Sequence, residues 1–418
     1  MMEYKYLLDL AVILLSTKVL GLITKKVQMP QVVGALLAGV ILGPALLGVL
    51  DETSFLHEIA EIGVIVLMFG AGMETDIKEL KASGRASFVI ALCGVIIPLI
   101  GGFGISYVFN RPSLIVSDAT ASSFLQNVFI GVILTATSVS ITVETLKELG
   151  KLKTKSGNAI LGAAIIDDIL GIIALTIVTG MADSSVNILI VLLKVAGFFV
   201  FSGIIGFIFY KLYKKWTEST NQGLHRHAII AFVFCLTMAY LSESWFGVAD
   251  ITGAFIAGLI ISNVDKSTFV QAKVDTLSYM LLSPVFFACI GLKVALPNMS
   301  NIIILYAVLL VIVAILTKVL GCGLGAKLCG YQNYQAKRIG VGMISRGEVA
   351  LIVASKGSEL GLIGSVVLGP VVLVVVITTI ITPILLKIVF KKKPEQPVTK
   401  EKEVTSFYEQ ADKIRGEK

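Results

Sequence analysis

The segment from Ala163 to Thr179, AAIIDDILGIIALTIVT, places two adjacent carboxylates, Asp167 and Asp168, in the middle of an apolar run. Without these two residues the run has the composition of a helix that spans a lipid bilayer. A charged side chain at the centre of such a helix costs about 2.5–3.5 kcal/mol on insertion scales, so it is retained where it faces a partner, an ion or water. We therefore take the two aspartates as the centre of a functional site.

The composition of the chain predicts a membrane protein. Of its 418 residues 56% are hydrophobic and 15% are charged, and the mean hydropathy is +0.90. Apolar runs of about 20 residues are separated by short charged loops, which indicates membrane-spanning helices. A β-barrel would instead show short alternating strands. We predict an all-α polytopic membrane protein of about thirteen transmembrane helices, and we attribute the net charge of +7 to cytoplasmic loops, not to a nucleic-acid partner.

The distribution of basic residues predicts the orientation. Lysine and arginine gather in the loops that follow odd-numbered predicted spans, for example at Lys147, Lys151, Lys153 and Lys155. The opposite loops carry few basic residues. Because positive charge stays in the cytoplasm, we expect the amino terminus outside and the carboxyl terminus inside.

Two short sequence matches indicate an internal repeat. GALLAGVILG at 34–43 is similar to GAFIAGLIIS at 253–262, and FGAGM at 69–73 is similar to ACIGL at 288–292; both matches have an offset of 219 positions. Seven predicted spans separate the copies, so the second copy is inverted. Two inverted six-helix repeats with a site at the bilayer midplane are a transporter architecture.

Two polar stretches predict interrupted helices. Gly131 to Leu146, GVILTATSVSITVETL, is crowded with hydroxyl side chains, which weaken a helix and supply oxygen ligands. The alternative is that these hydroxyls bond back to their own helix. Gly342 to Val353, GMISRGEVALIV, carries Arg346 and Glu348 next to Gly347, where the chain can unwind. For this second stretch a structural pair of Arg346 with Glu348 is favoured over ligation of an ion.

Lys318, in AILTKVLGCG, is a basic residue deep in an apolar span and needs a counter-charge. Asp167 or Asp168 is the obvious partner; the alternative is that Lys318 reaches an interface. Neighbouring residues on a helix point about 100° apart, so one aspartate can face Lys318 while the other faces an ion path. A carboxylate that binds either a proton or a small cation predicts cation/proton exchange.

The motifs TATSVSITVETLKELGKL, AIIDDILG and SRGEVALIVA, with the lysine, resemble the monovalent cation:proton antiporter-2 family, and most closely its bacterial NapA-type Na⁺/H⁺ antiporters. The resemblance covers about residues 5–390. It implies an NhaA/NapA-like fold with broken crossing helices, a homodimer in the bacterial inner membrane, and elevator-type alternating access.

The resemblance also implies a division of the chain. Residues 1–390 would form the transmembrane antiporter domain, and residues 391–418 a charged cytoplasmic tail. Within the domain, about 1–75 and 226–294 would form the dimerisation part, about 86–181 and 300–390 the core ion-transport part, and 186–212 a linker helix.

By the same resemblance Asp168 is the main carrier of Na⁺ and H⁺, and Asp167 pairs with Lys318. Thr137 and Ser138 would lie at the first helix break, and Arg346 and Glu348 at the second.

The function expected from residues and resemblance together is exchange of Na⁺ or Li⁺ for H⁺. A K⁺/H⁺ antiporter and a sodium-coupled organic-anion symporter are the alternatives. We expect no enzyme activity, no cofactor apart from the transported ions, no nucleic-acid partner and, since the chain lacks a P-loop motif, no nucleotide domain.

Overall fold

The computed structural model describes residues 4–26, 29–111, 114–115, 118–182, 188–219, 224–264, 266–293, 299–391 and 395. Within these ranges the regular secondary structure is helical. The elements are α1 (Lys5–Lys26), α2 (Gln31–Leu42), α3 (Ser54–Glu74), α4 (Ile77–Phe109), α5 (Ser123–Ile133), α6 (Val139–Glu148), α7 (Lys155–Ala182), α8 (Ile188–Ser219), α9 (Leu224–Phe246), α10 (Asp250–Ile261), α11 (Ser267–Leu277), η1 (Ser278–Leu282), α12 (Ser283–Leu292), α13 (Asn301–Leu328), α14 (Asn333–Gly342), α15 (Glu348–Glu359) and α16 (Ser365–Lys391).

The helices have the lengths and compositions of membrane spans. Among the described residues, nine helices are long and apolar enough to cross a bilayer, and four shorter apolar helices accompany them. The all-α polytopic fold predicted from composition is therefore confirmed. The number of thirteen spans stays a prediction, because several crossings would have to be assembled from the shorter helices.

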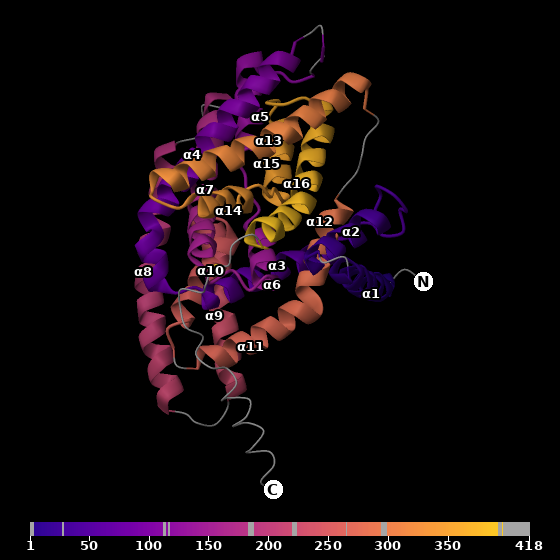
Figure 1. Cartoon of the computed structure of the whole chain (residues 1–418). Coiled ribbons are helices and arrows are strands. Elements are labelled where there is room, and N and C mark those ends of the chain that lie inside the picture. The colour runs from indigo at the N-terminus through magenta and orange to yellow at the C-terminus, as the bar shows by residue number, and fades with distance from the viewer. Residues whose placement is uncertain are drawn as a thin grey trace.

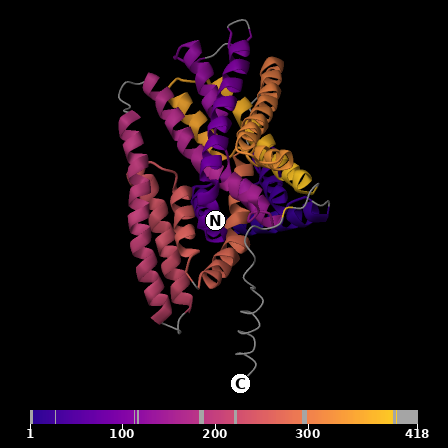
Figure 2. The ribbon, with the colours of Figure 1, turned by 60° about the vertical axis from the view of Figure 1, so that its left-hand side comes forward.

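The helices pack in two groups. In Figure 1, α4, α5, α7 and α13 to α16 gather in the upper part of the view, whereas α1 to α3 and α9 to α12 lie below them. The upper helices pack mainly on one another, as do the lower ones. Helix α8 packs on α7, α9 and α10 and so touches both groups; Figure 2 shows it along one edge of the molecule.

The lower group contains the same helix contact twice. A methyl group on Gly39 of α2 would lie 1.9 Å from the carbonyl oxygen of Ala288 in α12, and one on Gly72 of α3 would lie 2.1 Å from that of Phe255 in α10. In both places only glycine lets the two backbones meet. Residue 72 precedes Gly291 by 219 positions, and the α2–α12 and α3–α10 contacts exchange under that offset. The packing thus has the symmetry that the sequence repeat predicts.

Two helices are interrupted, α5–α6 and α14–α15; of their four halves, α6 packs on helices of both groups. Helix α5 ends at Ile133 and α6 begins at Val139, while α14 ends at Gly342 and α15 begins at Glu348. The five-residue segments between them are not helical, as the hydroxyl-rich and glycine-rich stretches indicated. They bring backbone groups that can bond outside their own helices to the interior, beside α7 and α13.

Candidate functional site

Asp167, on α7, is held by two other elements. Lys318 of α13 donates to both of its carboxylate oxygens, Oδ1 and Oδ2, at 2.9 Å, and the hydroxyl of Thr137 donates to Oδ2 at 2.7 Å. The side chains are closed off from the surface, with Asp167 2% and Lys318 0% exposed. A buried ion pair is tolerated when further hydrogen bonds complete its geometry, and Thr137 supplies one. The structure therefore brings three of the predicted site residues together and excludes the alternative that Lys318 reaches an interface.

Asp168 differs from its neighbour. One position further along α7 it points about 100° away from Asp167, and it is half-buried. In the part of the chain that the structure describes, no hydrogen-bond or ion-pair partner reaches its carboxylate. A carboxylate in a helix interior without such a partner is available to a proton or to a cation.

The two interrupted helices are joined at their breaks. The backbone N–H of Ser138 donates to the carbonyl of Ser345 at 2.8 Å, and the hydroxyl of Ser345 donates to the carbonyl of Ser138 at 2.8 Å. Thr142 adds a bond to the carbonyl of Gly342 at 2.7 Å. The hydroxyl of Thr142 therefore bonds across to the second stretch, whereas those of Thr135 and Thr145 bond back to their own helices, at Val132 and Ile141.

Arg346 lies buried at the crossing point. Its guanidinium donates to the carbonyls of Ile344 at 2.5 Å and Leu134 at 2.6 Å, and to that of Ala314 at 3.3 Å. The first two carbonyls follow the ends of α14 and α5, where a helix carries partial negative charge. Arg346 thus neutralises two half-helix ends. The side chain of Glu348 lies outside what the structure describes, so its pairing with Arg346 stays a prediction.

Two threonines that the sequence analysis missed hold the second break. The hydroxyl of Thr378 accepts from the backbone N–H of Arg346 at 3.2 Å, and the hydroxyl of Thr379 donates to the carbonyl of Arg346 at 2.5 Å. Both lie in the middle of α16, in the run ITTIIT. Adjacent hydroxyls inside an apolar helix were the available signal.

Gly94 of α4 is a further residue without a sequence signal. A methyl group there would lie 2.5 Å from Sγ of Cys322, 3.6 Å from Oδ1 of Asp167 and 3.7 Å from Nζ of Lys318. The glycine backbone therefore lies directly against the ion pair, and the absence of a side chain at position 94 leaves room for Cys322 of α13.

Helix α6 connects the upper group to the lower one by charged contacts. The carboxylate of Glu148 accepts from the backbone N–H groups of Gln31 at 2.6 Å and Val32 at 3.1 Å. The amine of Lys147 forms ion pairs with Glu74 at 3.0 Å and Asp275 at 3.1 Å. Water can replace the partners in these polar contacts, so the contacts connect the two groups without locking them together.

Comparisons with known proteins agree with this arrangement. Residues 11–392 match the model of the family described as "Sodium/hydrogen exchanger, transmembrane". A Bacillus cereus protein named Na(+)/H(+)-K(+) antiporter GerN is 38% identical over 94% of this chain and 98% of its own length. An Enterococcus hirae Na(+)/H(+) antiporter is 36% identical over 92% of this chain and 97% of its own.

Solved structures show the same fold. The sodium proton antiporter MjNhaP1 from Methanocaldococcus jannaschii superposes with a TM-score of 0.70 at 19% identity, over 94% of this chain and 96% of its own.

Proposed function

The chain belongs to the sodium/hydrogen exchanger family and is a cation/proton antiporter of the membrane, not an enzyme, and from this premise we propose that it exchanges Na⁺ or Li⁺ for H⁺ at Asp168. The observation that supports Asp168 as the carrier is the contrast within the pair. Asp167 has its carboxylate oxygens engaged by Lys318 and Thr137. Asp168 has a half-buried carboxylate to which no described residue donates.

The exchange follows from competition for one carboxylate. A proton on Asp168 removes the charge that binds Na⁺, and bound Na⁺ repels the proton, so loading on one side of the membrane displaces the ion brought from the other. Because Thr137 bonds to the neighbouring Asp167, the first break packs against this part of α7, and in this proposal Thr137, Ser138 and carbonyls of the break supply further oxygen ligands. In this proposal Asp167, Lys318 and Arg346 keep the surroundings of Asp168 in place.

Alternating access is proposed to be an elevator-type movement. The core part, about 86–181 and 300–390, would move against the part formed by about 1–75 and 226–294, with the helix at 186–212 as linker and the latter part forming a homodimer. The polar contacts of Lys147 and Glu148 across this boundary support the proposal, because they can break and reform at small cost. The basic loops support an amino terminus outside and a cytoplasmic tail.

The test is ion exchange in proteoliposomes that contain a pH-sensitive dye. With the wild-type chain, NaCl added outside should dissipate a preset proton gradient, and Asp168→Asn should abolish the response. Asp9→Asn is the matched control, because Asp9 is also a buried aspartate but lies on α1, away from the core part. Unchanged exchange in Asp168→Asn would exclude Asp168 as the carrier.

K⁺/H⁺ exchange is the second candidate, since the name of the Bacillus cereus relative includes potassium. Carboxylate, hydroxyl and carbonyl oxygens bind both ions, and cavity dimensions decide between them. The same assay with KCl or LiCl in place of NaCl separates the candidates.

A further inference from the structure

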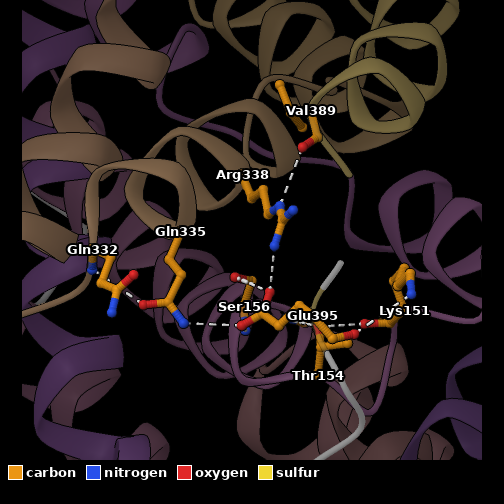
Figure 3. Close-up of polar contacts among 9 residues, drawn as sticks. Lys151, Thr154, Ser156, Gln332, Gln335, Arg338, Val389 and Glu395 are labelled. Carbon is orange, nitrogen blue, oxygen red and sulfur yellow. Dashed lines mark hydrogen bonds and ion pairs between the residues drawn. The ribbon is translucent and has the colours of Figure 1, made fainter. Parts of the chain in front are cut away.

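Glu395, which follows α16, lies in a pocket of hydrogen-bond donors. Its Oε1 accepts from Nε2 of Gln335 at 3.0 Å and from the backbone N–H of Ser156 at 3.3 Å. Its Oε2 accepts from Oγ of Ser156 and from Nη1 of Arg338, both at 2.8 Å. Figure 3 shows these donors converging on the carboxylate from different elements. Four donors for two oxygens are the complement of an anion.

Arg338 is built into this pocket and is not a surface charge. Its side chain is 0% exposed, and its guanidinium lies between the rings of Tyr334, 4.8 Å away, and Phe390, 4.5 Å away. Its Nε donates to the carbonyl of Val389 at 3.3 Å. Cation–π contacts and this bond fix the planar group with Nη1 directed at Glu395.

The pocket also uses the start of α7. Ser156 is the second residue of that helix and offers both its backbone N–H and its hydroxyl. The first N–H groups of a helix have no partner within it and carry partial positive charge. Lys151 adds a long contact from its amine to the carbonyl of Glu395, at 3.5 Å. The donor set is therefore complete only when an anion is present.

We propose that this pocket is an anion-binding site whose resident ligand is the carboxylate of Glu395. A free carboxylate, or an oxyanion such as phosphate, occupies the same donors when residue 395 cannot. Only 8% of Glu395 is exposed, so its side chain is buried among these donors and not solvated. Residue 395 is thus attached to the helix bundle through its own carboxylate.

The hydrogen bonds of Glu395 connect two helices, α7 and α14, that lead to the functional site. Ser156 lies in the first turn of the helix that carries Asp167 and Asp168, and Arg338 lies one turn before Gly342, where α14 ends at the second break. A seated carboxylate therefore joins the ends of the two helices that lead to the ion pair and to the crossing. An empty site would leave Arg338 buried without its carboxylate, and a cation in that state is strongly unfavourable.

Chemical rescue of the full-length chain in detergent tests this proposal. Glu395→Ala should lower the apparent melting temperature by about 5 °C, because it breaks a buried ion pair. Tetramethylammonium formate should restore most of the loss, and inorganic phosphate part of it, while tetramethylammonium chloride at the same ionic strength should not. Formate should leave the wild type and Glu401→Ala unchanged; the latter removes one carboxylate from the same tail.

A second variant keeps the test decisive. Glu395→Gln retains the shape of the side chain without its charge, so its melting temperature should fall less than that of Glu395→Ala and should not respond to formate. Adding Ser156→Ala to Glu395→Ala should weaken the apparent affinity for formate about tenfold, since two of the four bonds come from Ser156 and its hydroxyl is lost. Equal responses to formate and chloride, or a wild-type melting temperature in Glu395→Ala, would overturn the proposal.

Discussion

The close approach of α4 to the ion pair gives the sharpest test of the site geometry. Gly94 faces Cys322 of α13, and a methyl group added at Gly94 would lie 2.5 Å from the Cys322 sulfur. Cys322 is one turn beyond Lys318 on the same helix and is fully buried. We predict that Gly94→Ala both destabilises the chain and slows exchange.

The magnitude follows from the overlap. A carbon–sulfur contact at 2.5 Å is about 1 Å shorter than an ordinary contact between non-bonded atoms. Cys322 can escape by changing rotamer, but a helix restricts χ1 and the site is packed. Otherwise α4 and α13 separate, and Lys318 moves with α13 away from Asp167. Overpacking of this kind costs about 1–3 kcal/mol.

A double-mutant cycle identifies the cause. Cys322→Ala removes the sulfur and should cost about 1 kcal/mol by itself. In Gly94→Ala/Cys322→Ala the new methyl group occupies the vacated space, so the pair should be more stable than Gly94→Ala alone, with a coupling of about 1–2 kcal/mol. Stability is followed by thermal unfolding in detergent, and exchange by the proteoliposome assay.

Gly104→Ala is the control on the same helix. No described atom outside the adjoining backbone of α4 lies within 4 Å of the methyl group that it adds, so it should be neutral or stabilise α4 by up to about 1 kcal/mol. Strictly additive effects of the two substitutions, or full exchange activity in Gly94→Ala, would refute the proposed packing over the ion pair.

Two further predictions concern the pair and the boundary between the helix groups. Thr137→Val removes the hydroxyl that donates to Asp167. It should lower the free energy of unfolding by about 1.5–3 kcal/mol and raise the apparent KM for Na⁺. The control Thr135→Val removes a bond within its own helix and should change the KM little. Cysteines at Gln31 and Glu148, in a chain otherwise free of cysteine, should react with a short bifunctional thiol reagent and stop exchange reversibly; continued exchange in the cross-linked protein would contradict the elevator proposal.

The sequence could predict those parts of the site whose residues are energetically unfavourable in a membrane-spanning helix. The two aspartates and Lys318 are each unfavourable alone in an apolar helix, so a pair between Lys318 and one of the aspartates could be inferred without coordinates. That the partner is Asp167 is implied only by the family resemblance. The breaks at 134–138 and 343–347 could be located because hydroxyl and glycine residues weaken helices there.

Other contacts could not be predicted from the sequence, because the residues that make them look like any other residue of their type. In the sequence Arg338 is one more of the basic residues from which the orientation is predicted, yet it is buried in α14 and paired with Glu395. Gly94 is one of 39 glycines, and only the position of α13 shows why it has no side chain. Such contacts join distant parts of the chain and leave no periodic signal.

The unequal environments of the two aspartates also bear on why exchange would be coupled. With Asp167 held by Lys318, the net charge of the site depends on the occupancy of Asp168. A proton and a Na⁺ ion leave the same net charge, and the empty site is one unit more negative. A movement that can take place with a proton bound can therefore also take place with Na⁺ bound. In the empty state the half-buried Asp168 carries an uncompensated charge, which opposes the movement.

This argument extends to the neutral variant. Asp168→Asn has the charge of a loaded site permanently, so the core should continue to move although nothing is exchanged. At a constant pH, cross-linking between cysteines at Gln31 and Glu148 should then proceed in Asp168→Asn at a rate independent of Na⁺, whereas with Asp168 present Na⁺ should change that rate. A cross-linking rate that still responds to Na⁺ in Asp168→Asn would show that the charge controlling the movement lies elsewhere.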